Sequence, residues 1–226
     1  MAAACAAAVM VLSGCTTELV DGNAVAATDL GHVAAPVTVA ALQSLLPSPE
    51  QLDTALGVQG LAVRASSTRG YGGQTASDDC AATWNVAWQP MYTGSGWVAM
   101  RAQDLQTRDR EQRVWQAVAS FPLPVDAVAF YRKQVNAWQV CNGRRIEMRY
   151  LTEPASADAF FTLAPAADHD GVLSQTATQA NDPTWMCEHA LSAANNVVVD
   201  MQVCGAHLTG QAESVTRAVV AKVPVS

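Results

Sequence analysis

The chain has 226 residues, of which half are apolar and 15% are charged, with a formal net charge of −7. This length suits one domain with a tail, or at most two small domains. The sequence argues against a nucleic-acid partner, because phosphate neutralisation needs clustered Lys and Arg and no basic run occurs.

The first fourteen residues resemble the end of a secretory signal peptide, being small, apolar and too short to span a membrane. The segment Leu12-Ser13-Gly14-Cys15 resembles the bacterial lipobox. We therefore predict a lipoprotein signal peptide at 1–14 and a lipid anchor at Cys15, where two acyl chains such as palmitate would give stable attachment. No Lys or Arg precedes the apolar stretch, which a start site further upstream would explain. The alternative is an ordinary alanine-rich terminus.

Residues 15–37 are polar and small without a helical or strand period, and they are predicted to form a lipid-anchored tether. Residues 38–226 are predicted to form a single domain. We expect this domain to lie in the cell envelope, on the extracytoplasmic face of the plasma membrane.

The apolar pattern of the domain predicts helices near both ends with strands between them, which is an α+β fold with an antiparallel sheet packed by helices. The second helix is expected to begin at Ser48 as N-cap, and the last one at Thr209. The expected helices are 37–46, 48–57, one ending near Pro90, 125–141 and 209–224. The expected strands are 60–67, 96–105, 112–121, 144–151, 158–164, 171–179 and the two strands of a hairpin within 187–205.

The hairpin allows one disulfide to be assigned. Asn tolerates the positive φ of a two-residue turn, so Asn195-Asn196 is the expected loop. Counting outward from this turn places Cys187 directly opposite Cys204, in a non-hydrogen-bonded pair whose Cα atoms approach to about 4.5 Å. That distance is within disulfide reach. The same count makes His189 and Gln202 cross-strand neighbours, which suits a structural hydrogen bond.

The second disulfide follows from the remaining cysteines. With Cys5 in the signal peptide and Cys15 at the anchor, Cys80 and Cys141 are left to pair. The alternative is a Cys/His metal site, since His189 and His207 lie near the hairpin cysteines. Zinc sites prefer tight Cys-x-x-Cys or His-x-x-x-His spacing, which this chain lacks, so no metal and no cofactor are expected.

Several motifs together resemble a known family, the mycobacterial PknH-like extracellular sensor domain. The resemblance covers residues 38–224 and rests on "LLPSPEQLDTALG", "DDC", "MYTGSGWVAMRAQDL", "VASFPLPVDAVAFYRKQVNAWQVCNGR", "WMCEHALSAANNVVVDMQVCG" and "VAKVP". It implies a twisted antiparallel sheet, two disulfides and a cleft thought to bind a ligand. The chain resembles a stand-alone lipoprotein member of the mycobacterial envelope, because the motifs of a kinase domain are not found in it.

One strand face carries candidate ligand-binding residues. In the predicted strand 96–105, Trp97, Arg101 and Gln103 share the less apolar face. An indole beside a guanidinium can hold a sugar, an anion or a polar lipid head group. The alternative is that Trp97 packs under a helix while Arg101 meets a surface carboxylate.

Catalytic residues are not expected. The Gly-Ser-Gly run before Trp97 lacks the Gly-x-Ser-x-Gly spacing of a nucleophile elbow, and Asp168-His169-Asp170 is typical of a solvated turn. We therefore expect a non-enzymatic lipoprotein that binds a small-molecule or lipid ligand. The alternatives are a protein–protein interaction module of the envelope and, third, an uncharacterised hydrolase.

Overall fold

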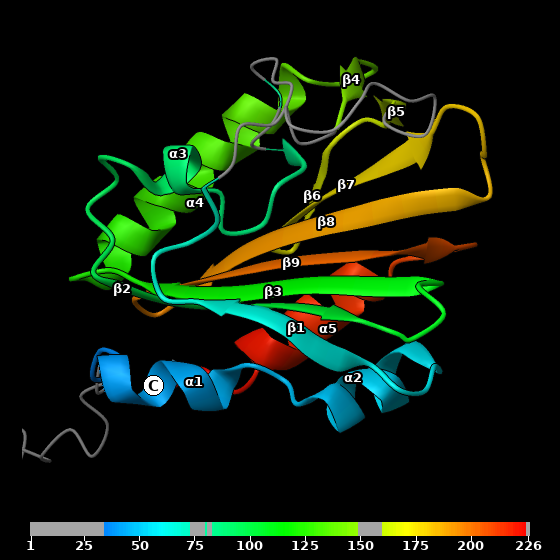
Figure 1. Ribbon diagram of the computed structural model, residues 1–226. Helices are drawn as coiled ribbons and strands as arrows, with labels where there is room; N and C mark the ends of the chain where they lie inside the picture. The colour runs from blue at the N-terminus through cyan, green and yellow to red at the C-terminus, as the bar shows by residue number, and fades with distance from the viewer. Residues whose placement is uncertain (1–33, 73–79, 81–82, 149–159, 225–226) are drawn as a thin grey trace, which may run out of the picture. The chain divides into compact units, whose positions relative to one another are not determined.

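The computed structural model describes residues 34–72, 80, 83–148 and 160–224, all of which belong to one compact unit. Its centre is an antiparallel sheet in the order β1-β2-β3-β9-β8-β7-β5-β4, with β6 paired to β7 (Figure 1). The strands of the described residues are β1 (Ala62–Ser67), β2 (Ala99–Gln106), β3 (Gln112–Ser120), β4 (Arg145–Glu147), β5 (Phe160–Leu163), β6 (Ala167–His169), β7 (Val172–Gln179), β8 (Trp185–Ala194) and β9 (Val197–Ala206).

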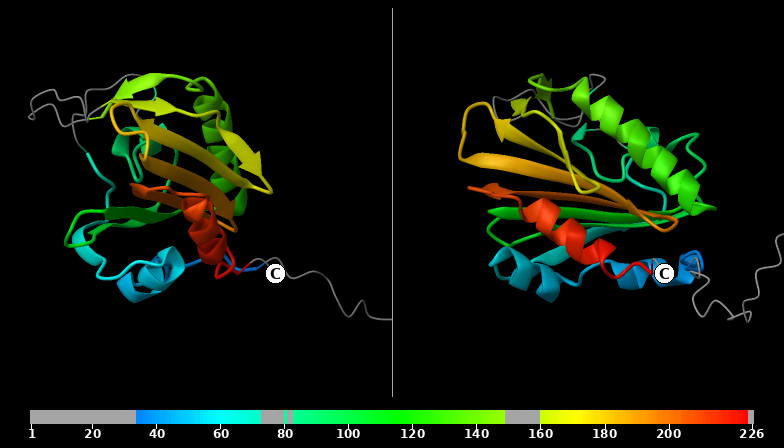
Figure 2. Two further views of the ribbon diagram at one scale, coloured as in Figure 1. Left: turned by 90° about the vertical axis from the view of Figure 1, so that its right-hand side faces the viewer. Right: turned by 180° about the vertical axis from the view of Figure 1, so that it is seen from behind.

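Helices cover both faces of this sheet. Figure 2 shows α4 and α5 on opposite sides, so we call the two faces the α4 face and the α5 face. The α4 face also carries α3, and the α5 face also carries η1, α1 and α2. The helices are η1 (Val39–Ala41), α1 (Leu42–Leu45), α2 (Pro49–Leu56), α3 (Gln89–Tyr92), α4 (Pro124–Gln139) and α5 (Gln211–Val220). This arrangement confirms the predicted α+β fold.

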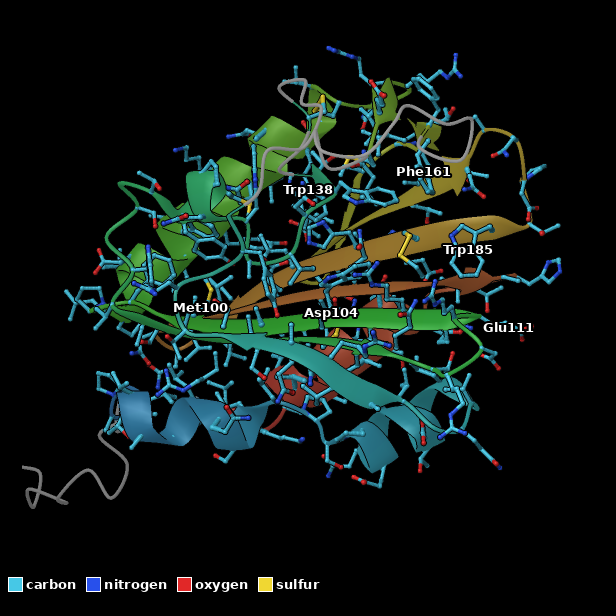
Figure 3. The ribbon with its side chains drawn as sticks, viewed as in Figure 1. Met100, Asp104, Glu111, Trp138, Phe161 and Trp185 are labelled. Carbon is cyan, nitrogen blue, oxygen red and sulfur yellow. A yellow bond between two sulfur atoms is a disulfide. The ribbon has the colours of Figure 1, made fainter. Side chains whose placement is uncertain are left out.

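Two cores result, because the central strands are buried on both sides. Along β9, Val197 and Val199 belong to the core of the α5 face, whereas Val198 belongs to the core of the α4 face. This alternation is the period-2 pattern of a strand. A third cluster surrounds both disulfides, and Figure 3 shows Phe161 and Trp185 there, further along the same side of the sheet as Trp138.

Short-range sequence signals place several helices correctly. Ser48 caps α2, since its hydroxyl accepts from the Gln51 backbone N–H while the Gln51 side chain accepts from the Ser48 backbone N–H. At α4, Pro124 occupies the first turn and the Asp126 carboxylate accepts from the Leu123 backbone N–H. Both helices lie where the sequence predicts them.

The start of α5 differs from the prediction. Gly210, not Thr209, is the N-cap residue, and no side-chain cap is present there. The buried carboxylate of Glu188, on β8, accepts instead from the backbone N–H groups of Gly210 and Ala212. A carboxylate suits the positive end of a helix. Because the cap comes from a strand that is distant in sequence, local sequence rules cannot predict it.

The prediction of a helix that ends near Pro90 is also wrong. Residues 84–87 lie in turns and irregular backbone, Trp88 forms a β-bridge with Tyr71, and the short helix α3 begins only at Gln89. Ala87 has a φ of 52°, and its carbonyl accepts from the Tyr71 backbone N–H. Because these backbone groups bond to distant partners, they do not form helical i to i−4 bonds. A further strand, β6, was not predicted; it forms a hairpin with β7.

Both disulfides are confirmed. Ala194 and Val197 close the hairpin, Asn195 adopts a φ of 48°, and Cys187 lies opposite Cys204 with 4.0 Å between their Cα atoms. Cys80 and Cys141 form the second bridge, with a Cα–Cα distance of 5.7 Å.

The hairpin turn also holds both ends of the described chain. The Asn195 side-chain amide donates to the carbonyl oxygens of Ala35 and Pro224, both at 2.9 Å. The neighbouring Asn196 carboxamide oxygen accepts from the Val37 backbone N–H at 2.7 Å. The predicted signal peptide and all of the tether before residue 34 lie outside the described residues, as does Cys15. Of the helices that the structure describes, none has the length and apolarity needed to cross a membrane.

We predict that Cys80→Ser lowers the free energy of unfolding by about 3–4 kcal/mol, because the bridge closes a loop of 61 residues. Urea unfolding followed by circular dichroism would measure the change. Cys141→Ser and the double variant should lose no more than Cys80→Ser, since all three remove the same bridge. Unchanged unfolding in Cys80→Ser, or additive losses in the double variant, would contradict the assignment.

Candidate ligand-binding site beside helix α4

A buried carboxylate organises the α4 face. Asp200, on β9, is fully buried, and its Oδ2 accepts from the Ala87 backbone N–H at 2.8 Å and from the Tyr92 hydroxyl at 2.9 Å. Its Oδ1 lies 2.7 Å from His189 Nε2 on the neighbouring strand β8. One side chain therefore joins the turns before α3, the helix α3 itself and the centre of the sheet.

The protons of this network follow from its partners. His189 Nδ1 lies 2.8 Å from the carbonyl oxygen of Thr83, which can only accept, so Nδ1 carries a proton. The contact between Nε2 and Asp200 then shares a second proton between imidazole and carboxylate. Burial, followed by the charge of Asp200, raises the pKa of Tyr92 well above its usual value. The phenol therefore remains a donor to Asp200.

An Asp–His pair occurs in the catalytic sites of many hydrolases, but both ring nitrogens of this histidine already have partners. The Nδ1 of His189, where a nucleophile could bond, is taken by the backbone carbonyl of Thr83. The Thr83 hydroxyl donates to the Cys80 carbonyl at 2.9 Å. Trp138 also covers the imidazole, with 4.4 Å between ring centroids. The arrangement holds the turns against the sheet and leaves the His189 imidazole buried.

The predicted bond between His189 and Gln202 is wrong, although their predicted register is confirmed. The two residues are directly opposite each other on β8 and β9. His189 instead bonds to Asp200, its diagonal neighbour, and the Gln202 amide donates to the carbonyl of Trp84. Counting residues along the two strands predicts which residue lies opposite, but it does not predict which neighbour a long side chain bonds.

The three residues of the predicted ligand-binding face do not come together. Trp97, which precedes β2, packs against the core of the α4 face. Within β2, Arg101 and Gln103 alternate with residues of that core and belong to the α5 face. The Arg101 guanidinium donates to the Met100 carbonyl, and Gln103 accepts from the Gln116 side chain, both at 2.8 Å.

The acidic triplet at 168–170 forms part of the β6–β7 hairpin. Asp168 Oδ1 accepts from the Gly171 backbone N–H at 3.2 Å, while Asp170 and Gly171 both have positive φ. This geometry is that of a tight turn, as the sequence predicts. Within the described ranges, no group of three or more His, Cys, Asp or Glu side chains is placed to hold a metal ion.

A pocket lies between α4, the β6–β7 hairpin and β8. It has a volume of about 530 Å³, within the range of small-molecule sites. On α4 its residues recur at helical spacing and so form one stripe. The lining residues are Val128, Tyr131, Arg132, Val135 and Asn136 from α4, Asp168 from β6, Gly171 from the hairpin turn and Ala193 from β8.

Tyr131 lines the pocket, but its hydroxyl oxygen is buried and has no exposed surface. The residue as a whole is 8% exposed. Burial raises the pKa of Tyr131, and the interaction of the hydroxyl with Asp168 raises it further. The sequence predicts the helix over 125–141 but not the pocket beside it, because the pocket also needs the β6–β7 hairpin.

Comparison with known proteins identifies the family. The model of the PknH-like extracellular domain matches residues 37–222. The chain belongs to the PknH-like extracellular domain family. Membership of this family of extracellular sensor domains, together with the two disulfides, indicates an extracytoplasmic location.

Individual relatives agree with this assignment. The serine/threonine-protein kinases PknH of Mycobacterium bovis and Mycobacterium tuberculosis are 30% identical to this PknH-like chain over 147 residues. That alignment spans 64% of the chain but only about a quarter of each kinase. The crystal structure of the extracellular domain of PknH from Mycobacterium tuberculosis superposes with a TM-score of 0.76 at 25% identity, over 83% of this chain and 97% of that domain.

In this PknH-like domain, we predict that Asp200→Asn costs about 3–5 kcal/mol of unfolding free energy, because it removes one partner of a buried, charge-assisted network. The matched control is Glu213→Gln, which breaks a partly exposed ion pair with Arg217 and should cost no more than about 0.5 kcal/mol. Urea unfolding of both variants makes the comparison. Equal losses would show that the network does not organise the fold.

Proposed function

We propose that this chain is an envelope lipoprotein whose PknH-like domain binds a small ligand without catalysis, in the pocket beside α4. One observation carries the proposal: α4 and the β6–β7 hairpin line a pocket of about 530 Å³ whose wall combines apolar side chains with the exposed polar groups of Arg132, Asn136 and Asp168. Small-molecule sites usually have this form, an apolar lining with a few polar groups that fix the ligand.

The surroundings of the pocket support a preformed site. Helix α4 is held on the sheet by aromatic contacts, with Phe130 stacked on Tyr92 at 4.8 Å between centroids and Trp138 against His189 at 4.4 Å. Both partners belong to the Asp200 network, so the helix rests on a fixed base. A preformed site loses little conformational entropy when a ligand binds.

Two features support a non-catalytic role. In the buried pair of Asp200 and His189, the free side of the imidazole is bonded to the Thr83 carbonyl. The family is also one of extracellular sensor domains. The relatives in the comparison are kinases by name, and that activity is a property of those longer proteins.

Native mass spectrometry of protein extracted gently from its own envelope tests the binding role. We expect a bound mass that is lost on collisional activation, and a weaker signal for it in Asn136→Ala and Asp168→Asn. Arg101→Ala is the decisive comparison, because Arg101 belongs to the strand face predicted from the sequence. Loss of the bound mass in Arg101→Ala alone would move the site to that face, and protein without any bound mass would favour a protein partner.

The anchor is tested separately. We expect wild-type protein to begin at Cys15, to carry acyl mass and to partition into the detergent phase, because two acyl chains give stable membrane attachment. Cys15→Ala should remain in the aqueous phase with unchanged folding. Equal partitioning of the two proteins would exclude lipid attachment at this residue.

A further inference from the structure

We propose that the group bound in the pocket beside α4 is neutral and polyhydroxylated, a sugar ring or a polyol. The inference rests on the proposed function, because it names the ligand class of that same site. It follows from the combination of charge, hydrogen-bonding capacity and apolar surface in the pocket wall.

The charges of the wall cancel. Arg132 is the cation and Asp168 the anion among the residues that line the pocket. Within the described part of the chain, Arg132 has no ion-pair partner, and Asp168 accepts from the Gly171 backbone N–H. A ligand of either sign would therefore meet one group that attracts it and one that repels it.

Solvent reduces what charge can contribute. The side chains of Arg132 and Asp168 are both exposed, and ion pairs at exposed positions are worth about 1 kcal/mol or less. The two groups gain more as a hydrogen-bond donor and acceptor than as charges. Binding by a simple anion or cation would consequently be weak.

Hydroxyl groups match the polar atoms of this wall. A hydroxyl both donates and accepts, so one oxygen can donate to Asp168 while it accepts from Arg132, and both of these side chains are exposed at the pocket. The Asn136 amide adds another donor and another acceptor. Together these groups can bond several hydroxyls on one ring.

The remaining wall is apolar. Val128, Val135 and Ala193 lie between the polar groups of α4 and the hairpin, and they are partly buried. Sugar and cyclitol rings carry C–H groups as well as hydroxyls, so they can pack on such a surface while their oxygens reach the polar groups. Small ions offer no comparable apolar surface.

Isothermal titration with defined probes tests the ligand class. We expect methyl glucoside or myo-inositol to bind with a millimolar-range Kd, and inorganic phosphate, tetramethylammonium and the zwitterion glycine betaine to bind at least about tenfold more weakly. The Kd of the polyol should change less than about twofold between about 50 mM and about 500 mM salt, because a neutral ligand is not screened.

Matched variants locate the binding. Asn136→Ala and Asp168→Asn should weaken the polyol by about tenfold each, whereas the neighbours Lys133→Ala and Asp170→Asn, which do not line the pocket, should leave it unchanged. Asn136→Ala should also unfold no earlier than wild type, since the Asn136 side chain is exposed. A merely structural Asn136 would instead show a loss of stability.

The outcomes separate the two proposals. Tighter binding of phosphate, tetramethylammonium or betaine, lost in Asn136→Ala and Asp168→Asn, would overturn the ligand class and keep the pocket as a binding site. Polyol binding that these variants leave unchanged, or no binding by any probe, would overturn both the ligand class and the pocket as a binding site. Vesicles that contain a glycosyl diacylglycerol show whether the ligand is a lipid head group or a soluble molecule. Binding of the protein to these vesicles that depends on Asp168 supports a lipid head group. Binding of the free sugar without binding to the vesicles supports a soluble ligand.

Discussion

The rest of the structure depends on the buried carboxylate of Asp200. A charged oxygen pair with no solvent exposure must be satisfied inside the protein. The partners that satisfy it, Ala87, Tyr92 and His189, bring a segment with little regular structure onto the centre of the sheet. That segment then supplies the aromatic base on which α4 rests. The network thus helps to fix the helix, and with it the wall of the pocket, together with the direct packing of α4 on the sheet.

The parts of the fold that local rules govern were predictable. A two-residue Asn-Asn turn and the period of a strand are enough to place Cys187 opposite Cys204, because both rules act over a few residues. The extent of α4 and the Ser48 cap are of the same kind, since helix spacing and capping are short-range properties. Most of the architecture can therefore be predicted from the chain's local pattern and from its resemblance to the family.

The features that the sequence could not predict depend on distant partners. The turns before α3 are fixed by a bond between Ala87 and Asp200, which are 113 residues apart. The cap of α5 comes from Glu188 on another element. Trp97 lies on the face opposite to Arg101, because strand alternation does not extend to a residue before the strand begins. The pocket likewise combines a helix stripe with a hairpin, and neither segment contains it alone.

The side chain of Asn195 has a consequence for how the domain is presented. Because it binds both Ala35 and Pro224, the chain enters and leaves the domain at one corner of the sheet. The pocket wall at Ala193 is two residues from that corner, whereas Cys187 and Cys204 are at the other end of the hairpin. A support attached at either terminus would therefore join the domain at this one corner, and the disulfide end of the hairpin would be the end far from the attachment.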